Sequence, residues 1–274
     1  MKSIRRKLLG LLATAAIAAA WVVAAPGAAL AADGATCQGG SVAGGSYSSL
    51  TITGVCAVNA GNVEVRGNLT VKRGAVLAAV FSGSNLKVGR NLSVQKGAIL
   101  ILGCEPFAFP CANDPDAQTG GTLSASGSVG GNLTAENALA VLVHNTSIGR
   151  NLELEGGGGG VSCVPNPILT SIAGFPAPPY ATFEDVSIRG SASISEWQSC
   201  WLGFFRNTVG NNVNFNENVT ADPDGNEVAT NTIQGNLNCE KNSPAPQIGD
   251  SGGSLNSVAG HARGQCAALA VHPA

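Results

Sequence analysis

A seven-residue unit recurs along this chain and limits its fold more than any other feature. Each copy starts with Val or Ile, has Asn at its fourth position and Leu or Val at its fifth, and ends on an apolar residue. Six copies are clear, at 65–71, 88–94, 129–135, 148–154, 209–215 and 233–239. A decayed seventh copy lies at 188–192, so that successive copies start 23, 41, 19, 40, 21 and 24 residues apart. Each of the two long intervals hides a degenerate copy or carries an insertion.

The unit has the pattern of a short strand that follows a bend. Apolar residues alternate with small or polar ones at its end, which is typical of a strand with one buried face. The Gly and Asn before that strand tolerate left-handed backbone angles and supply the bend. A second short apolar run, such as 97–102, lies between copies. Two or three strands separated by bends, closing within 19–24 residues, fit one turn of a β-solenoid.

These observations predict an all-β fold, a parallel β-helix (β-solenoid) with loop insertions and disulfide-stapled caps. Stacked coils pair equivalent strands about 4.8 Å apart, so we expect the Asn of each copy to form a ladder along one corner, each amide bonding its neighbours. The ladder would comprise Asn68, Asn91, Asn132, Asn151, Asn212 and Asn236. A leucine-rich repeat needs Leu at several fixed positions and a helical segment, and neither is found in this chain. A β-sandwich would give alternating strands without an Asn at a fixed position of each repeat.

The first 31 residues have the pattern of a signal peptide. A basic head is followed by an apolar run over 8–25 and by small residues at 29–31, so we expect cleavage after Ala31. No later apolar stretch reaches membrane-spanning length, and we expect no membrane insertion after signal removal. Eleven Lys and Arg then face seventeen Asp and Glu, a net charge of about −6. This balance argues against nucleic acid as a partner.

All eight cysteines follow the signal peptide, and an even number in an exported chain indicates disulfides. Pairing each cysteine with its neighbour in the sequence is the simplest of many connectivities. It gives the pairs Cys37–Cys56, Cys104–Cys111, Cys163–Cys200 and Cys239–Cys266. Metal ligation by cysteine is disfavoured because the chain has no C-x-x-C spacing and three His in all. The cysteines and the signal together predict a secreted, extracellular protein.

The chain divides into a repeat body and two ends. We expect a signal peptide at 1–31, an N-terminal cap at 32–60, a β-helix body at 61–239 and a C-terminal cap at 240–274. Two Pro-containing segments, 104–121 and 156–180, depart from the repeat and are predicted to be insertions. Loops on a solenoid are common places for binding.

Four aromatic residues gather in one stretch of a chain that has few. They are Trp197, Trp201, Phe204 and Phe205. Exposed, they would form a ligand-binding surface that stacks on sugar rings; buried, they would fill a wide coil or a cap.

Three carboxylates lie close to these aromatic residues in the sequence. They are Glu184, Asp185 and Glu196, and glycoside hydrolysis requires a carboxylate pair. If the chain is a non-catalytic protein, we expect no catalytic residue. If it is a carbohydrate-active enzyme, these three carboxylates are the candidate catalytic residues.

Calcium is the one cofactor that the sequence suggests, and the signal is weak. Asp222, Asp224 and Asn226 place side-chain oxygens at alternate positions, as calcium loops do, but the bidentate Glu of an EF-hand would fall at Ile233. A turn at Asp-Pro or Asp-Gly is the alternative. The stretch 249–253 is similar to the nucleophile segment of trypsin-like serine proteases, yet their upstream His motif is absent, which favours a Gly/Ser turn.

The C-terminal part resembles a module of exported Gram-positive bacterial proteins that have no assigned activity. The resemblance rests on residues 235–239, 242–246, 249–252 and 264–266, and the upstream repeats are similar in a looser Gly-Asn-Leu sense. It implies export, a β-helical body and a Cys239–Cys266 closure, and it implies no reaction. In architecture the chain also resembles the β-helix polysaccharide lyases and hydrolases, whose acidic surface clusters are not matched in these repeats.

The expected function is that of a secreted, non-catalytic β-helix protein with a structural, adhesive or glycan-binding role at the cell surface or outside the cell. The expected partner is a polysaccharide or another cell-surface component. The alternative is a carbohydrate-active enzyme, a polysaccharide lyase or glycoside hydrolase, on the same scaffold.

Overall fold

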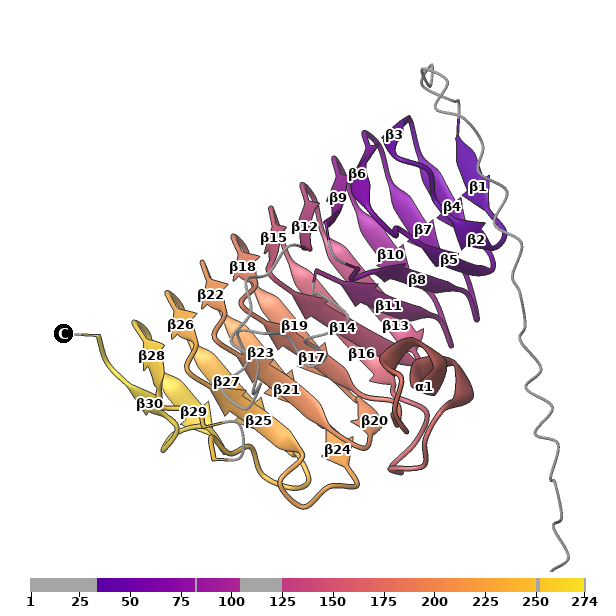
Figure 1. The fold of residues 1–274 in the computed structure, drawn as a ribbon. Helices are drawn as coiled ribbons and strands as arrows, with labels where there is room; N and C mark the ends of the chain where they lie inside the picture. Colours follow the sequence, from indigo (N-terminus) through magenta and orange to yellow (C-terminus); the bar gives the residue numbers. More distant parts are fainter. Residues whose placement is uncertain (1–33, 82, 104–124, 250–251, 274) are drawn as a thin grey trace, which may run out of the picture.

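The structure, a computed structural model, describes residues 34–81, 83–103, 125–249 and 252–273. Over these residues short strands follow one another around a single axis and stack into a rod, as Figure 1 shows. Three long sheets run along the rod, and every strand pairing within them is parallel. The predicted all-β parallel β-helix is confirmed.

Each sheet collects the equivalent strand of successive coils. Sheet I contains β1 (Ala35–Cys37), β4 (Leu50–Ile52), β7 (Leu69–Val71), β10 (Leu92–Val94), β13 (Leu133–Ala138), β16 (Leu152–Gly157), β19 (Ala192–Ser195), β23 (Val213–Asn216), β27 (Leu237–Glu240) and β29 (Ala262–Gly264). Sheet II contains β2 (Gly40–Ser41), β5 (Val55–Ala57), β8 (Val76–Ala79), β11 (Ile99–Leu102), β14 (Ala140–His144), β17 (Ala181–Glu184), β21 (Leu202–Phe205) and β25 (Asn226–Ala229). Sheet III contains β3 (Gly45–Tyr47), β6 (Gly61–Val65), β9 (Ser84–Val88), β12 (Ser126–Val129), β15 (Thr146–Ile148), β18 (Ser187–Ile188), β22 (Thr208–Val209), β26 (Thr232–Ile233), β28 (Asn256–Val258) and β30 (Ala270–Val271). A short pair, β20 (Gln198–Ser199) and β24 (Val219–Thr220), lies at the bend between sheets I and II.

The repeat unit sets the register of the coils. Equivalent residues of successive copies pair directly: Leu69 with Leu92, and Leu92 in turn with Leu133. The latter pair spans one of the two long intervals, so that interval holds an insertion and not a hidden copy. The other long interval also holds an insertion, because Leu152 pairs directly with Ala192 of the decayed copy.

The core of the rod follows from the two-residue alternation of the strands. In sheets I and III the apolar residue of each strand points inward and its polar neighbour outward, as in the buried Leu92 and Val94 beside the partly exposed Ser93. In sheet II both faces are buried over several strands, including β8, β11 and β14. Sheet II therefore faces the core on one side and a second layer on the other.

The predicted Asn ladder is present along the bend between sheets III and I. The backbone N–H of Asn91 donates to Oδ1 of Asn68 at 3.1 Å, and that of Asn132 donates to Oδ1 of Asn91 at 2.9 Å. The same bond links Asn151 to Asn132, and Asn236 to Asn212. The rungs thus join a side chain to the backbone of the next coil, where we had expected contacts between amides.

The ladder explains why a glycine precedes it in many coils. A Cβ on Gly131 would lie 2.3 Å from Oδ1 of Asn91, and a Cβ on Gly190 would lie 2.3 Å from Oδ1 of Asn151. Both distances are far shorter than a van der Waals contact, so these two coils need glycine at this position, whereas other coils of the ladder carry Arg90 and Arg150 there.

Two further Asn ladders, which we had not predicted, lie buried in the C-terminal half of the rod. In one, the backbone N–H of Asn207 donates to Oδ1 of Asn231, whose own N–H donates to Oδ1 of Asn256. In the other, Asn218 bonds Asn242 in the same way. Their Nδ2 groups donate to core-strand carbonyls, so each side chain satisfies backbone groups at a buried bend.

The insertion before β17 carries the one described helix, α1 (Pro167–Ala173). Asn166 caps its start by accepting the N–H groups of Ile168 and Leu169, and Gly174 ends it with a left-handed φ of 77°. Leu169 and Ala177 pack on the outer face of sheet II against an apolar cluster. That cluster comprises Val76, Ala78, Val80, Ile99, Ile101, Ala140 and Leu142. The helix is too short to span a membrane, and no described helix is long and apolar enough to do so.

Three of the four predicted disulfides are confirmed: Cys37–Cys56, Cys163–Cys200 and Cys239–Cys266. The first joins the two N-terminal coils, the second ties the α1 insertion to the rod, and the third joins the two C-terminal coils. The predicted Cys104–Cys111 pair, the whole of the predicted 104–121 insertion and the predicted 1–31 signal peptide lie outside the described residues. The segments expected to be caps contain strands β1 to β5 and β28 to β30, which continue the three sheets.

Candidate functional site

A cluster of charged side chains lies on the outer side of sheet II near its C-terminal half. His144 ends β14 and Glu184 ends β17, and the two pair in register on neighbouring strands. Asp185 and Arg206 follow the ends of β17 and β21 and have left-handed φ values of 54° and 59°. These bends bring Arg206 against Glu184 and Asp185, which lie one coil earlier in the sequence. The two carboxylates are among the candidate catalytic residues.

Arg206 holds both carboxylates of this cluster. Its Nη2 donates to Oε2 of Glu184 at 2.8 Å, and its Nε donates to both carboxylate oxygens of Asp185 at 3.1 and 3.2 Å. The other oxygen of Glu184 accepts the hydroxyl of Thr182 at 2.8 Å and lies 3.6 Å from Nδ1 of His144. The side chain of Glu184 is 1% exposed.

The environment moves the pKa values of the two carboxyls apart. Burial raises the pKa of Glu184, but the charge of His144, the hydrogen bond from Thr182 and the charge of Arg206 lower it by more, so that it lies below its ordinary value. Burial is the largest effect on Asp185 and raises its pKa above the ordinary value, against the hydrogen bonds and charge of Arg206. Glu184 is therefore held as a carboxylate.

The arrangement favours a structural role for Glu184 and Asp185. Both oxygens of Glu184 are occupied by protein donors, and a general acid or nucleophile for glycoside hydrolysis must reach the substrate. The third candidate, Glu196, is exposed at the bend after β19, and none of the hydrogen bonds and ion pairs of Glu184 and Asp185 involves it. The structure thus brings two of the three candidates together around a shared arginine.

The aromatic candidates lie mostly in packed positions. Trp197, Phe204 and Phe205 are buried, and Nε1 of Trp197 donates to Oγ of Ser199 at 2.7 Å. Trp201 is partly exposed and packs edge-on against Phe205, with the ring centroids 5.8 Å apart. Burial of the first three favours packing over sugar stacking, and Trp201 alone keeps some accessible surface.

The segment suggested for calcium forms a turn that is closed by its own hydrogen bonds. Oδ1 of Asp222 accepts the N–H of Asp224 at 3.1 Å, and its carbonyl accepts the N–H of Gly225. Asn226 points inward and its Nδ2 donates to the carbonyl of Pro244 at 2.8 Å. Within the described ranges, no three His, Cys, Asp or Glu side chains are grouped to hold a metal ion. The protease-like stretch 249–253 is only partly described.

A straight row of hydroxyl side chains runs along the outer face of sheet III. The register pairs the outward residues of six successive strands, from β12 to β28. They are Ser128, Ser147, Ser187, Thr208, Thr232 and Ser257. Their inward neighbours, such as Ile148 and Val209, are buried in the core, so the row is fixed to the face by packing.

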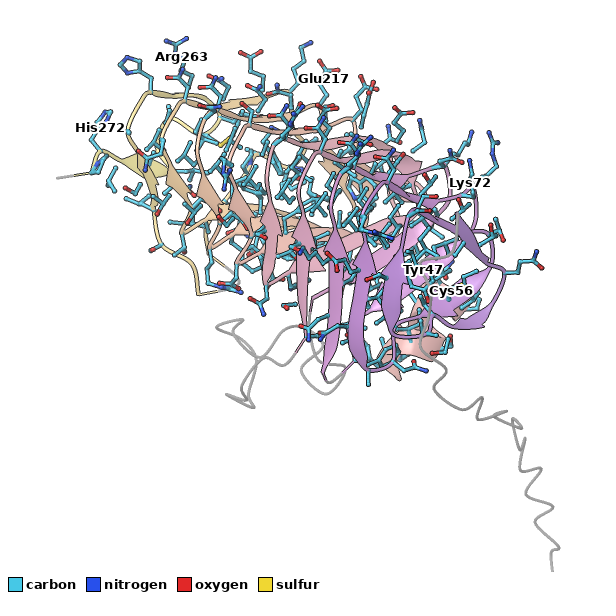
Figure 2. The ribbon with its side chains drawn as sticks, turned by 90° about the horizontal axis from the view of Figure 1, so that it is seen from above. Tyr47, Cys56, Lys72, Glu217, Arg263 and His272 are labelled. Carbon is cyan, nitrogen blue, oxygen red and sulfur yellow. A yellow bond between two sulfur atoms is a disulfide. The ribbon has the colours of Figure 1, made fainter. Side chains whose placement is uncertain are left out.

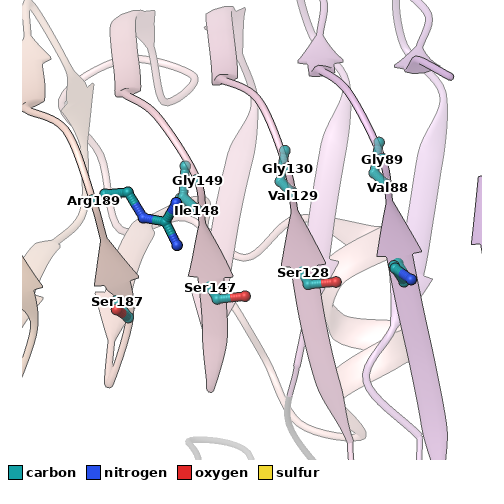
Figure 3. A pocket seen from close by; sticks show the side chains of 11 residues that line it. Val88, Gly89, Ser128, Val129, Gly130, Ser147, Ile148, Gly149, Ser187 and Arg189 are labelled. Atoms are coloured by element: carbon teal, nitrogen blue, oxygen red, sulfur yellow. The ribbon is translucent and has the colours of Figure 1, made fainter. Parts of the chain in front are cut away.

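The N-terminal end of this row borders a shallow trough that bears basic residues, which we name the serine–arginine trough. It consists of two hollows of about 340 and 240 Å³ that share Gly89 and Gly130. The lining residues include Lys87, Gly89, Arg90, Asn91, Ser128, Gly130, Gly131, Ser147, Gly149, Arg150, Ser187 and Arg189. Figure 3 shows the serines and glycines as two parallel lines crossing the strands, with the Arg189 side chain extending over the neighbouring strand.

The trough is positively charged. Lys87 is paired with Glu64 at 3.1 Å, and the two side chains are 66% and 44% exposed. Arg90, Arg150 and Arg189 are exposed and make no ion pair with any residue in the described part of the chain. No Asp or Glu of that part lines either hollow. The trough thus offers hydroxyls, backbone groups and unpaired guanidinium groups to a ligand.

Our sequence reasoning missed this trough, although a signal for it exists. A Ser or Thr stands directly before the first residue of five repeat units, as in Ser147-Ile148 and Thr208-Val209. Because alternate residues of a strand point to opposite faces, a hydroxyl beside a core residue faces outward in every coil. The arginines at the bends carry no such signal, because the sequence alone does not place them beside this row.

No family model matches this chain, and neither a curated protein nor a solved structure matches it.

Proposed function

We propose that this chain is a secreted, non-catalytic β-helix protein that binds an extended polysaccharide along the outer face of sheet III. The observation that carries the proposal is the row of six hydroxyls, which crosses six successive coils in one line. Neighbouring strands lie about 4.8 Å apart, so the row presents donors and acceptors at a regular spacing. A regular line of polar groups suits a ligand that itself repeats along its length.

Weak, repeated contacts are sufficient for such a ligand. A single hydroxyl contributes little binding energy against water, but contacts made by successive units of one polymer add through their effective concentration. The open shape of the serine–arginine trough supports this, since it leaves room for a chain to enter and leave at both ends.

The disulfides support an extracellular location. Three of them tie together the described part of the chain, and disulfides persist in oxidising compartments. The rigid coil stack then holds the hydroxyl row in place without a ligand, which reduces the entropic cost of binding.

The test is binding of the oxidised protein to a panel of soluble and insoluble wall polysaccharides, with sugar ends released into solution measured in the same samples. The variant Ser147→Ala/Ser187→Ala/Thr208→Val removes three exposed hydroxyls from the row. The matched control, Thr70→Val/Ser93→Ala/Thr134→Val, removes three consecutive outward hydroxyls from sheet I.

We expect retention of at least one polysaccharide, a loss of about tenfold in affinity for the sheet III variant, and little change for the sheet I control. Equal effects of the two variants would place binding elsewhere. Release of sugar ends that Glu184→Gln abolishes would contradict the non-catalytic part of the proposal.

A further inference from the structure

The serine–arginine trough contains a notch between two arginines, where one coil carries no side chain. Arg90, Gly131 and Arg150 occupy the same bend in three successive coils, joined by backbone hydrogen bonds from Gly131 N–H to the Arg90 carbonyl and from Arg150 N–H to the Gly131 carbonyl. The hollow of about 240 Å³ lies between the two arginines and is floored by Gly130 and Gly131.

Two glycines with close neighbours leave this notch open. A Cβ on Gly131 would collide with Oδ1 of Asn91, and a Cβ on Gly130 would lie 2.5 Å from the carbonyl oxygen of Gly89. The neighbouring coils also have glycine at the Gly130 position, as Gly89 and Gly149, but they carry Arg90 and Arg150 at the Gly131 position. The opening between Arg90 and Arg150 is therefore due to Gly131, the one residue of the three that carries no side chain.

The cations of the trough differ from the cation of the charged cluster. Arg206 is held by Glu184 and Asp185, so its charge is neutralised within the fold. Arg90 and Arg150 have no such partner among the described residues, although the chain carries two more acidic than basic side chains. Guanidinium groups bind carboxylates and phosphates through two parallel hydrogen bonds, so the unpaired arginines fit an anionic group.

The spacing of the cations points to several anions on one ligand. Arg90 and Arg150 are two coils apart, which is about 10 Å along the rod. Arg189 lies one coil further, since Ile148 and Ile188 pair directly, and borders the hollow that contains the serines. The trough lining contains no aromatic side chain on which bases would stack, which favours a glycan over a single-stranded nucleic acid.

We infer that the polysaccharide taken by the trough is acidic, and that its carboxylate or phosphate groups seat in the notch between Arg90 and Arg150 while its sugar hydroxyls meet the serine row. This inference rests on the proposed function and specifies its ligand class. Carboxylated and phosphodiester-linked glycans share the required chemistry.

The experiment compares four probes on the same oxidised protein: sodium polygalacturonate, its fully methyl-esterified form, poly(glycerol phosphate) and single-stranded DNA of similar length. Arg90→Gln/Arg150→Gln removes two charges from the trough. Lys72→Gln/Arg73→Gln is the control, because it removes two exposed charges at the bend between sheets I and II, where Lys72 projects from the edge that also carries Glu217 (Figure 2). Thermal unfolding verifies that both variants fold.

We expect polygalacturonate, poly(glycerol phosphate) or both to bind at least tenfold more tightly than the methyl ester, and the Arg90→Gln/Arg150→Gln variant to lose roughly ten- to hundredfold in affinity for the acidic polymer. The control should bind like the unmodified protein, and Arg90→Lys/Arg150→Lys should recover part of the loss because it keeps the charge without the planar fork.

Other results would overturn the inference in distinguishable ways. Equal binding of polygalacturonate and its methyl ester, with the sheet III hydroxyl variant still impaired, would remove the acidic specificity and leave the proposed function intact. Tighter binding of DNA than of either acidic glycan would replace the ligand class. If no glycan binds, neutral or acidic, both the acidic specificity and the proposed polysaccharide-binding function are wrong.

Discussion

The two halves of the rod deal with polar groups in opposite ways. Among the described residues, eleven of the fourteen buried polar or charged side chains lie after residue 181. The outer face of sheet II shows the change most clearly: in β8 and β11 it is apolar and packs beneath α1, whereas in β17 it carries Thr182 and the ion-paired Glu184. The N-terminal half is stabilised mainly by apolar packing, and the C-terminal half adds a buried polar network.

The Asn ladders make the comparison quantitative, because the same bond occurs in both settings. Asn91 accepts the backbone N–H of Asn132 at 2.9 Å on an exposed bend, and Asn231 accepts the N–H of Asn207 at 2.9 Å in the interior. Water can replace the exposed amide but cannot reach the buried one. The energetic importance of a rung is therefore set by its burial rather than by its geometry.

The largest effect is expected for Asn231→Ala. The substitution leaves the N–H of Asn207 and the carbonyl of Phe204 without their partners inside the core. At roughly 1–3 kcal/mol for each buried unsatisfied group, we expect a loss of about 3–4 kcal/mol in the free energy of unfolding. Denaturant unfolding of the oxidised protein measures it, and a loss below about 1 kcal/mol would show that water enters this bend.

An intermediate and pH-dependent effect is expected for Glu184→Gln. Because the pKa of Glu184 is lowered in the folded state, its carboxylate stabilises the fold above the ordinary carboxyl pKa, and this contribution is lost as the pH falls through the lowered value. We expect a loss of about 2 kcal/mol at pH 7, less than for a fully buried pair because Arg206 keeps Asp185. The difference from the unmodified protein should shrink below about pH 4.

Two controls sharpen this result. The exposed pair of Glu64 with Lys87 should make Glu64→Gln nearly neutral at every pH. Asp185→Asn should change the stability in the opposite direction at neutral pH, since the raised pKa of Asp185 makes its ionisation costly to the fold, and this difference should vanish in acid, where the carboxyl is protonated. Parallel pH profiles for all three variants would argue against a coupled buried cluster.

The smallest effect is expected for Asn91→Ala. The lost acceptor serves the N–H of Asn132 on a solvent-accessible bend, so we expect about 0.5–1 kcal/mol. One position of the same ladder is already occupied by Ser191, whose backbone N–H donates to Oδ1 of Asn151 but which has no amide side chain of its own. Comparison of this variant with Asn231→Ala in one unfolding series tests the burial argument directly, and similar losses for both would contradict it.

Much of the architecture could be predicted from the sequence because one set of residues is locked in phase. Leu69, Leu92 and Leu133 stand at one position of the repeat, and stacking them predicts both the strands and the exposed ladder. The buried ladders use Asn207 and Asn231, which stand two residues before the unit in successive copies. Their role was not evident because an Asn at a bend gives no sign of whether it faces solvent or core.

The candidate site was harder to predict for a related reason. Glu184 and Asp185 contact Arg206 of the next coil because Asp185 and Arg206 have left-handed backbone angles at the two bends. The order of charged residues in the sequence does not predict these angles. The notch in the trough exists because Gly131 has no side chain. A sequence pattern draws attention to the side chains that are present, whereas this site depends on the absence of one at Gly131.

The positions of the disulfides govern where unfolding of such a rod can begin. In a stack where each coil touches only its neighbours, opening starts at the ends, because a terminal coil is held on one side alone. Cys37–Cys56 and Cys239–Cys266 fasten the first and last coils to the coils beside them. The two disulfides therefore oppose separation of the terminal coils, which are the segments that a protease would otherwise cleave first. Proteolysis then depends on unfolding of coils in the middle of the rod.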